Sequence, residues 1–256
     1  NGNNFAPKAP PGACQVFRPN GPQTTFDINL EGECQGELPE YVAQFDTGAY
    51  VVIPIAPMNN SQHYTLTMWI NMLNVTTPNG GIIYSNGNPY TQLQIGITPS
   101  NTLFAQIWNN SASTWDGFYS GEVVPIGTWV FVAMNYSSTT GTATLFLNGI
   151  GQTGHFWELY NTKSYVSGIG INVGYYTENQ VYQGFKGYIS NVQVYNASLV
   201  QQEIQTIYKE GIGGAPIDLQ NLVGWWPLNG NANDYSGNGN NGVPGNVVFV
   251  SNWWQG

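Results

Sequence analysis

The chain has 256 residues and a formal net charge of −9, from 14 Asp and Glu against 5 Lys and Arg. Only 7% of the residues are charged, where about 25% is usual. The five bases form no cluster, and binding to phosphates or anionic lipids needs several together. We therefore expect no nucleic-acid binding, and no membrane insertion because no apolar run approaches about 20 residues.

Residues 1–40 differ in composition from the rest of the chain. Residues 1–13 hold three Pro, and a segment rich in Pro, Gly and Asn separates Cys14 from Cys34. A disulfide between them would close a loop of about twenty residues and contribute about 3 kcal/mol; two free thiols are the alternative. We predict an N-terminal extension with a disulfide loop over 1–40, followed by one domain over 41–256.

From Tyr41 onward, about ten short segments rich in β-branched and aromatic residues follow one another without a helix, a pattern typical of strands. They span residues 41–45, 49–55, 66–73, 80–85, 91–98, 102–108, 128–137, 142–149, 168–176 and 185–196. Asn148-Gly149 is typical of a type I′ hairpin, and Pro99-Ser100-Asn101 is a second hairpin candidate. Strands joined this way are antiparallel. We predict an all-β fold, a two-sheet antiparallel sandwich or jelly roll.

One segment, NASLVQQEIQTIYKEG, has the apolar spacing of a helix. The apolar stripe consists of Leu199, Val200, Ile204, Ile207 and Tyr208. Ser198 or Asn196 would serve as N-cap and Gly211 as C-cap. We predict one short helix near 198–210, lying over the edge of the sandwich.

Four ordered segments carry a resemblance to a known family. They are FDTGAYVVIP, LTMWIN, GTWVFVAMNYSSTTGTATLFLNG and FKGYISNVQVYNASLVQQEIQTIY. Together they resemble laminin G-like domains of the concanavalin A-like lectin/glucanase superfamily. The resemblance implies a jelly roll, and it identifies a fold better than a function.

The segment LVGWWPLNGNANDYSGNGNNG, residues 222–242, opens the domain in typical members but follows it here. In one arrangement, a circular permutation, residues 217–250 close the domain beside Tyr41 in the same chain. In another, the strand is donated to a neighbouring molecule, which would allow polymers. A truncated second copy is a third possibility. We favour closure within one chain.

Glucanases of this superfamily carry paired carboxylates in the form E-x-D-x-x-E. This spacing is missing from the sequence. Arg18 is the single arginine, and neither His63 nor His155 stands beside a Ser or Cys nucleophile motif. We predict that the protein is not an enzyme.

The resemblance also implies one structural Ca²⁺, held by acidic and Asn oxygens near the opening strand. Asp234 lies among several Asn with Ser236, a donor set that suits Ca²⁺. Asp46 would approach if the terminal strand packs beside it. The alternative is a turn in which Asp234 and its Asn neighbours cap their own backbone.

Aromatic residues gather in two segments of irregular sequence, 104–119 and 155–160. Sugar binding needs aromatic faces and planar polar groups. We therefore predict a ligand-binding set, with core or strand-edge packing as the alternative for each member: Trp108, Trp115, Asp116, Tyr119, Trp157 and Tyr160. Trp225 and Trp226 fall in a strand pattern and are assigned to the core.

Five glycosylation sequons favour export: Asn59, Asn74, Asn109, Asn135 and Asn196. Because the chain starts at Asn1 without a secretory leader, we expect it to be processed. We predict an extracellular or cell-surface recognition or adhesion module that binds carbohydrate, such as a cell-surface glycan. The alternative is a structural subunit of an extracellular filament or envelope, assembled from copies of itself.

Overall fold

The computed structural model describes a set of ranges that leaves most of the N-terminal extension aside. These ranges are 25–28, 34–46, 48–53, 63–73, 81–86, 93–109, 114–137, 139–140, 142–152, 155–157, 171–173, 177–178, 181–182, 185–251 and 253. Cys14 lies outside them and Cys34 begins a strand, so the disulfide stays a prediction. The division of the chain at residue 41 also stays a prediction.

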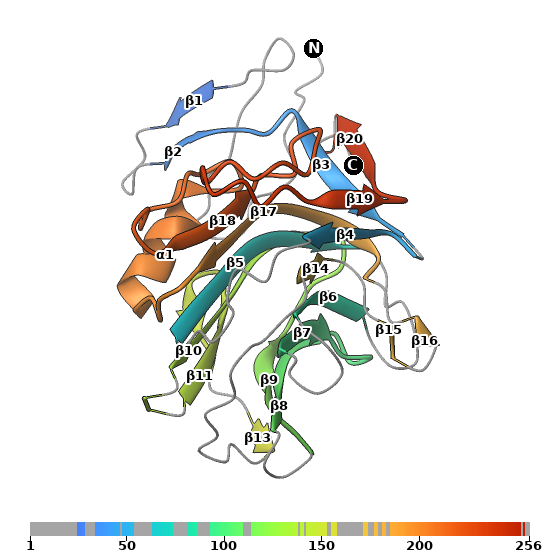
Figure 1. Ribbon diagram of the computed structural model, residues 1–256, viewed down its shortest axis with the longest axis vertical. Helices are drawn as coiled ribbons and strands as arrows, with labels where there is room; N and C mark the ends of the chain where they lie inside the picture. The colour runs from blue at the N-terminus through green and yellow to red at the C-terminus, as the bar shows by residue number, and fades with distance from the viewer. Residues whose placement is uncertain are drawn as a thin grey trace.

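Two antiparallel eight-stranded sheets form the sandwich (Figure 1). The first sheet runs in the order β12 (Ile150–Gly151), β11 (Thr142–Leu147), β10 (Trp129–Ser137), β5 (His63–Met72), β17 (Gly187–Tyr195), β3 (Tyr41–Phe45) and β20 (Val248–Ser251), with β18 (Leu222–Trp226) also pairing β17. The second sheet runs in the order β13 (His155–Trp157), β9 (Thr114–Val123), β8 (Thr102–Asn109), β7 (Leu93–Ile97), β6 (Gly81–Asn86), β14 (Ile171–Val173), β4 (Tyr50–Ile53) and β19 (Val243–Gly245). The all-β sandwich predicted from the sequence is confirmed.

Two further pairs of strands stand apart from the sheets. They are β1 (Thr25–Ile28) with β2 (Cys34–Glu37), and β15 (Thr177–Glu178) with β16 (Val181–Tyr182).

Strand β5 is buried on both faces. Its alternate residues Leu66, Met68, Ile70 and Met72 enter the core between the sheets, while Trp69 points to the outer side. There α1 (Gln201–Glu210) covers the sheet, and Tyr208 stacks on Trp69 with ring centroids 5.7 Å apart. The helix thus lies over the face of the first sheet and reaches its edge strand β12.

The predicted C-cap of α1 is confirmed, whereas the predicted N-caps are wrong. Gly211 follows the helix with a φ of 83°. The N-cap is Val200, not Ser198 or Asn196. Glu203 explains the difference, because its Oε2 accepts the Val200 N–H at 2.8 Å and its own N–H donates to the Val200 carbonyl at 3.0 Å, so these donors of the first turn need no Ser or Asn side chain.

Both predicted turns are confirmed. Asn148 and Gly149 have φ values of 50° and 75° between β11 and β12, as a type I′ hairpin requires. Asn101, with a φ of 63°, ends the turn between β7 and β8, and its N–H donates to the Thr98 carbonyl at 2.9 Å.

The C-terminal segment closes the sandwich within the same chain. Strand β18 pairs with β17, β19 pairs with β4, and β20 pairs with β3, where Ser251 lies opposite Tyr41. In Figure 1 the red C-terminal strands β19 and β20 lie beside the blue strands β3 and β4. The structure therefore has the arrangement that a circular permutation requires.

A last contact ties the C-terminal segment to the residues that precede β3. Trp253 Nε1 donates to the Pro39 carbonyl at 3.0 Å, and its ring packs edge-on against Trp129. Pro39 and its neighbour Leu38 are both buried. Within the described part of the chain, no helix is both long enough and apolar enough to span a membrane.

Candidate functional site

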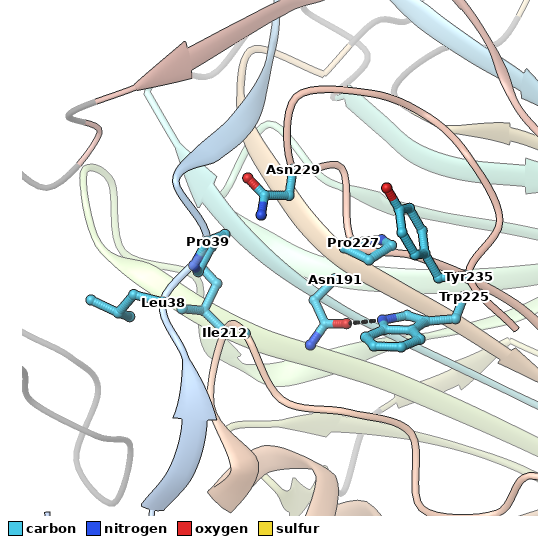
Figure 2. A pocket seen from close by; sticks show the side chains of 9 residues that line it. Leu38, Pro39, Asn191, Ile212, Trp225, Pro227, Asn229 and Tyr235 are labelled. Carbon is cyan, nitrogen blue, oxygen red and sulfur yellow. Dashed lines mark hydrogen bonds between the residues drawn. The ribbon is translucent and has the colours of Figure 1, made fainter. Parts of the chain in front are cut away.

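A pocket opens where the C-terminal segment meets the residues before β3 (Figure 2). It has a volume of about 280 Å³. Leu38, Pro39 and Ile212 lie on one side, and Trp225 and Tyr235 lie on the other. Asn191, Gly213, Pro227 and Asn229 complete the lining. We call it the terminal pocket.

Trp225 reaches this pocket because two tryptophans are adjacent in one strand, and successive side chains of a strand point to opposite faces. Trp226 turns inward, is 1% exposed, and donates from Nε1 to the Asn240 carbonyl at 2.8 Å. Trp225 therefore turns outward and is half-buried. Its ring meets that of Tyr235 at 66° with centroids 6.3 Å apart.

Asn191 fixes the orientation of the Trp225 indole. Its Oδ1 accepts from Trp225 Nε1 at 2.7 Å and from Gln193 Nε2 at 3.1 Å. Its Nδ2 donates to the Gly214 carbonyl at 2.8 Å. Asn191 has a φ of 52°, in a left-handed conformation that Asn tolerates better than most residues. This buried amide has partners at both ends, so the floor of the pocket is held in one arrangement.

Asp234 holds the turn that carries Tyr235. Its Oδ1 accepts the N–H of Trp225 at 3.0 Å and of Ser236 at 2.8 Å, and its Oδ2 accepts the N–H of Asn240 at 2.8 Å. Tyr235 N–H donates in turn to the Trp225 carbonyl at 2.7 Å. The carboxylate thus links the strand, the turn and the aromatic wall of the pocket.

Two polar groups at the rim have hydrogen-bond donors available for a ligand. Asn229 Oδ1 accepts the Tyr41 N–H at 2.8 Å, while its Nδ2 has no partner among the described residues. The Tyr235 hydroxyl accepts from Asn231 Nδ2 at 3.1 Å and retains its own proton to donate. Among the described residues, no charged side chain lines the pocket. The pocket therefore combines aromatic surface with neutral hydrogen-bond donors.

The predicted calcium ligands both have other partners. Asp234 already accepts hydrogen bonds from three main-chain N–H groups. Their partial positive charges stabilise the carboxylate without a metal ion. Asp46 is exposed and pairs with Lys186 at 3.2 Å. In the described ranges, no three His, Cys, Asp or Glu gather as a metal site would need. This donor set fits the capping alternative better than Ca²⁺, and calcium binding stays a prediction.

The residues predicted from the sequence to bind a ligand gather on three neighbouring strands. Trp108 is on β8, Trp115, Asp116 and Tyr119 are on β9, and Trp157 is on β13. Trp108 is the cross-strand partner of Trp115. Tyr160 lies outside the described residues. Their role in binding stays a prediction.

Strand β9, Thr114–Val123, was not among the strands predicted from the sequence. This segment contains Asp, Ser and two Gly, which are depleted in strands. Pairing with β8 on one side and β13 on the other overrides that preference. Tyr119 of β9 is 41% exposed and packs edge-on against Phe104.

The predicted glycosylation sites are only partly described. Asn59 and Asn74 lie outside the described residues, and Asn109 ends β8. Asn135 is on β10 and donates from Nδ2 to the Leu199 carbonyl at 2.8 Å, whereas Asn196 is exposed after β17. Modification of these residues stays a prediction.

The sequence profile of the concanavalin A-like lectin/glucanases superfamily matches residues 45–205. The chain belongs to this superfamily. The resemblance drawn from the four sequence segments is thereby confirmed. The matched region ends before the terminal pocket's Ile212, Trp225 and Tyr235. No curated protein sequence matches the chain.

Solved structures show the same fold at low sequence identity. A candidate carbohydrate-binding protein from Bacteroides ovatus ATCC 8483 has a TM-score of 0.63 and 17% identity, covering 83% of this chain. The chain spans only 60% of that protein's length. A native heptameric SAP-like pentraxin from Limulus polyphemus has a TM-score of 0.59 and 15% identity, covering 84% of this chain and 97% of its own.

A third structure is the CBM40 of the Ruminococcus gnavus IT-sialidase, bound to α2,3-sialyllactose. Its TM-score is 0.55 at 15% identity, covering 67% of this chain and 98% of its own.

Proposed function

We propose that this protein is a non-catalytic carbohydrate-binding module and that the terminal pocket is its binding site. The observation that carries the proposal is the half-buried Trp225 indole, which Asn191 holds in place beside Tyr235 in a pocket without charged lining residues. The module would act outside the cell, in recognition or adhesion.

The chemistry of a sugar matches this lining. A pyranose ring presents C–H groups that pack on an aromatic face, and hydroxyls that need polar partners around the ring. Trp225 and Tyr235 supply the aromatic surface, while Asn229 Nδ2 and the Tyr235 hydroxyl supply the donors. The volume of about 280 Å³ is near the lower limit of about 300 Å³ for ligand pockets. This volume suits one monosaccharide or the terminal sugar of an oligosaccharide.

The carboxylates that the structure describes support binding without hydrolysis. A glycosidase needs two carboxyl groups on either side of the scissile bond. None of the described residues that line the terminal pocket is Asp or Glu. Asp234 is the acidic residue nearest in sequence to Tyr235, and both of its carboxylate oxygens accept main-chain N–H groups. The described lining of the pocket therefore supplies neither a general acid nor a nucleophile.

The comparisons support the proposal through the fold alone. Other proteins built on this sandwich include a candidate carbohydrate-binding protein and the CBM40 that holds sialyllactose. The same scaffold hence accommodates sugar sites in proteins of very different sequence.

The face formed by β8, β9 and β13 is a second candidate site. Tyr119 is exposed there, and the cross-strand partners Trp108 and Trp115 lie on the same two strands as the pair Phe104 and Tyr119. Gln106 of β8 donates from Nε2 to Gln94 Oε1 of β7 at 2.7 Å. A test of the proposal must therefore separate the two locations.

Glycan-array screening of the full chain, followed by calorimetric titration of the best saccharide, tests the proposal. Tyr235→Ala should weaken binding at least tenfold, because it removes one aromatic wall and a donor. Tyr119→Ala is the matched control, an exposed tyrosine on the other sheet, and should change affinity less than twofold.

Loss of binding in Tyr119→Ala with normal binding in Tyr235→Ala would move the site to the second sheet. A protein that binds no saccharide on the array would overturn the proposed function.

A further inference from the structure

We infer that the terminal pocket selects uncharged saccharides over acidic ones such as uronic and sialic acids. The inference rests on the proposed function and adds the ligand class. It depends on three features of the pocket: the charges around it, the state of its buried amide, and the donors at its rim.

The charges near the pocket are negative. Glu40 follows Pro39 in the chain, Asp234 accepts the Trp225 N–H, and the Cβ of Glu210 lies against Gly214, the residue after Gly213 of the lining. The described ranges contain two lysines, Lys186 and Lys209, and neither of them lines the pocket. Lys186 pairs with Asp46, and Lys209 is exposed in the last turn of α1. A ligand carboxylate would therefore lose water without gaining a cation from any described residue, which is unfavourable.

The buried amide offers no positive charge in compensation. Asn191 accepts from Trp225 and Gln193 and uses one of its two Nδ2 protons on the Gly214 carbonyl, so it has at most one neutral N–H left for an anion. Rotating it would break these contacts in a buried site, where lost hydrogen bonds are costly.

The rim donors fit hydroxyl oxygens. Asn229 Nδ2 and the Tyr235 hydroxyl are neutral donors, and Figure 2 shows both side chains at the same rim of the pocket. Strong recognition of a carboxylate uses charged donors such as Arg. An uncharged sugar remains as the ligand that fits both the walls and the rim.

Pairs of a neutral sugar and a related acidic sugar test this inference. Glucose and glucuronate, and galactose and galacturonate, differ at C6 alone, and 3′-sialyllactose extends lactose by one acidic sugar. Binding of each to the full chain at pH 7 is measured by ligand-observed NMR and calorimetry. We expect each acidic partner to bind at least tenfold more weakly than its neutral counterpart.

Equal or tighter binding of the acidic sugars would overturn the inference while leaving carbohydrate binding intact. Choline that binds more tightly than the neutral sugars would also overturn it. Binding of none of these sugars, nor of any array glycan, would be the failure of the proposed function itself.

A charge placed at the rim sharpens the test. Asn229→Lys should raise the affinity for glucuronate at least fivefold relative to glucose, because the ammonium group would lie beside the ligand. Asn233→Lys is the matched control, since Asn233 is exposed on the same turn but does not line the pocket. It adds the same charge and should change the ratio less than twofold. An equal change in both variants would show that net charge, not the pocket, sets the preference, and would overturn the inference.

Discussion

Replacing Asp234 by Asn should destabilise the protein by about 2–3 kcal/mol. The carboxylate accepts three main-chain N–H groups, from Trp225, Ser236 and Asn240, at 2.8 to 3.0 Å. Hydrogen bonds to a charged acceptor contribute roughly 1.5–3 kcal/mol each. The Asn variant keeps one carbonyl oxygen for two of these donors but places an amide N–H₂ against the third. Because Asp234 is only half-buried, water offsets part of the loss.

Urea denaturation measures this effect as a lower midpoint at an unchanged slope. Asp218→Asn is the control, because Asp218 is also half-buried and accepts two bonds within a turn, both from Asn221, but these two bonds are exposed to solvent. It should cost less than about 1 kcal/mol. If the two variants lose the same free energy of unfolding to within about 0.5 kcal/mol, then the three hydrogen bonds of Asp234 do not stabilise the turn as argued.

Repeating both titrations with EDTA and with Ca²⁺ separates capping from calcium binding. Capping predicts midpoints that do not respond to either addition. A wild-type midpoint that rises with Ca²⁺, while that of Asp234→Asn stays fixed, would identify Asp234 as a metal ligand and would contradict the capping account.

Gly224→Ala should cost about 1–3 kcal/mol in urea denaturation, because a Cβ there would collide with the buried Trp226 ring; an unchanged midpoint would contradict this packing. Tyr64→Phe should leave stability unchanged or raise it by up to about 1 kcal/mol, because the buried Tyr64 hydroxyl has no hydrogen-bond partner among the described residues; a large loss would mean that the hydroxyl is satisfied. Burial raises the pKa of Glu210, so the folded state holds its proton more tightly and gains stability as the pH falls through that pKa. Glu210→Gln should therefore raise the melting temperature at pH 7 but not in the acid range, and the opposite pattern would contradict the direction of the shift.

The sequence alone predicted the sandwich and its closure because local signals were strong. Asn148-Gly149 has the positive φ values that its turn type requires, and Tyr41 lies opposite Ser251 as the displaced strand segment implied. Strand β9 was missed because its Gly, Ser and Asp residues do not favour strands. Only its pairing with distant segments makes it one.

The terminal pocket was missed for a different reason. Trp225 and Trp226 were both assigned to the core, although a strand that places one of two neighbours inside must place the other outside. That alternation is a signal that could have identified Trp225. The partners of Trp225 could not be found in this way, because Asn191 and Pro39 come near it only through the three-dimensional closure of the chain.

The pairing of the C-terminal strands with β3 and β4 also affects how the chain folds while it is being synthesised. Gly48 and its hydrogen-bond partner Asn246 are 198 residues apart. At about 5–20 residues per second, roughly 10 to 40 s pass between their synthesis. During this interval β3 and β4 await their last neighbours, and an unfinished sheet edge is a template for pairing with another chain. A cell that produces this protein must keep its nascent copies apart until β19 and β20 have been synthesised and paired.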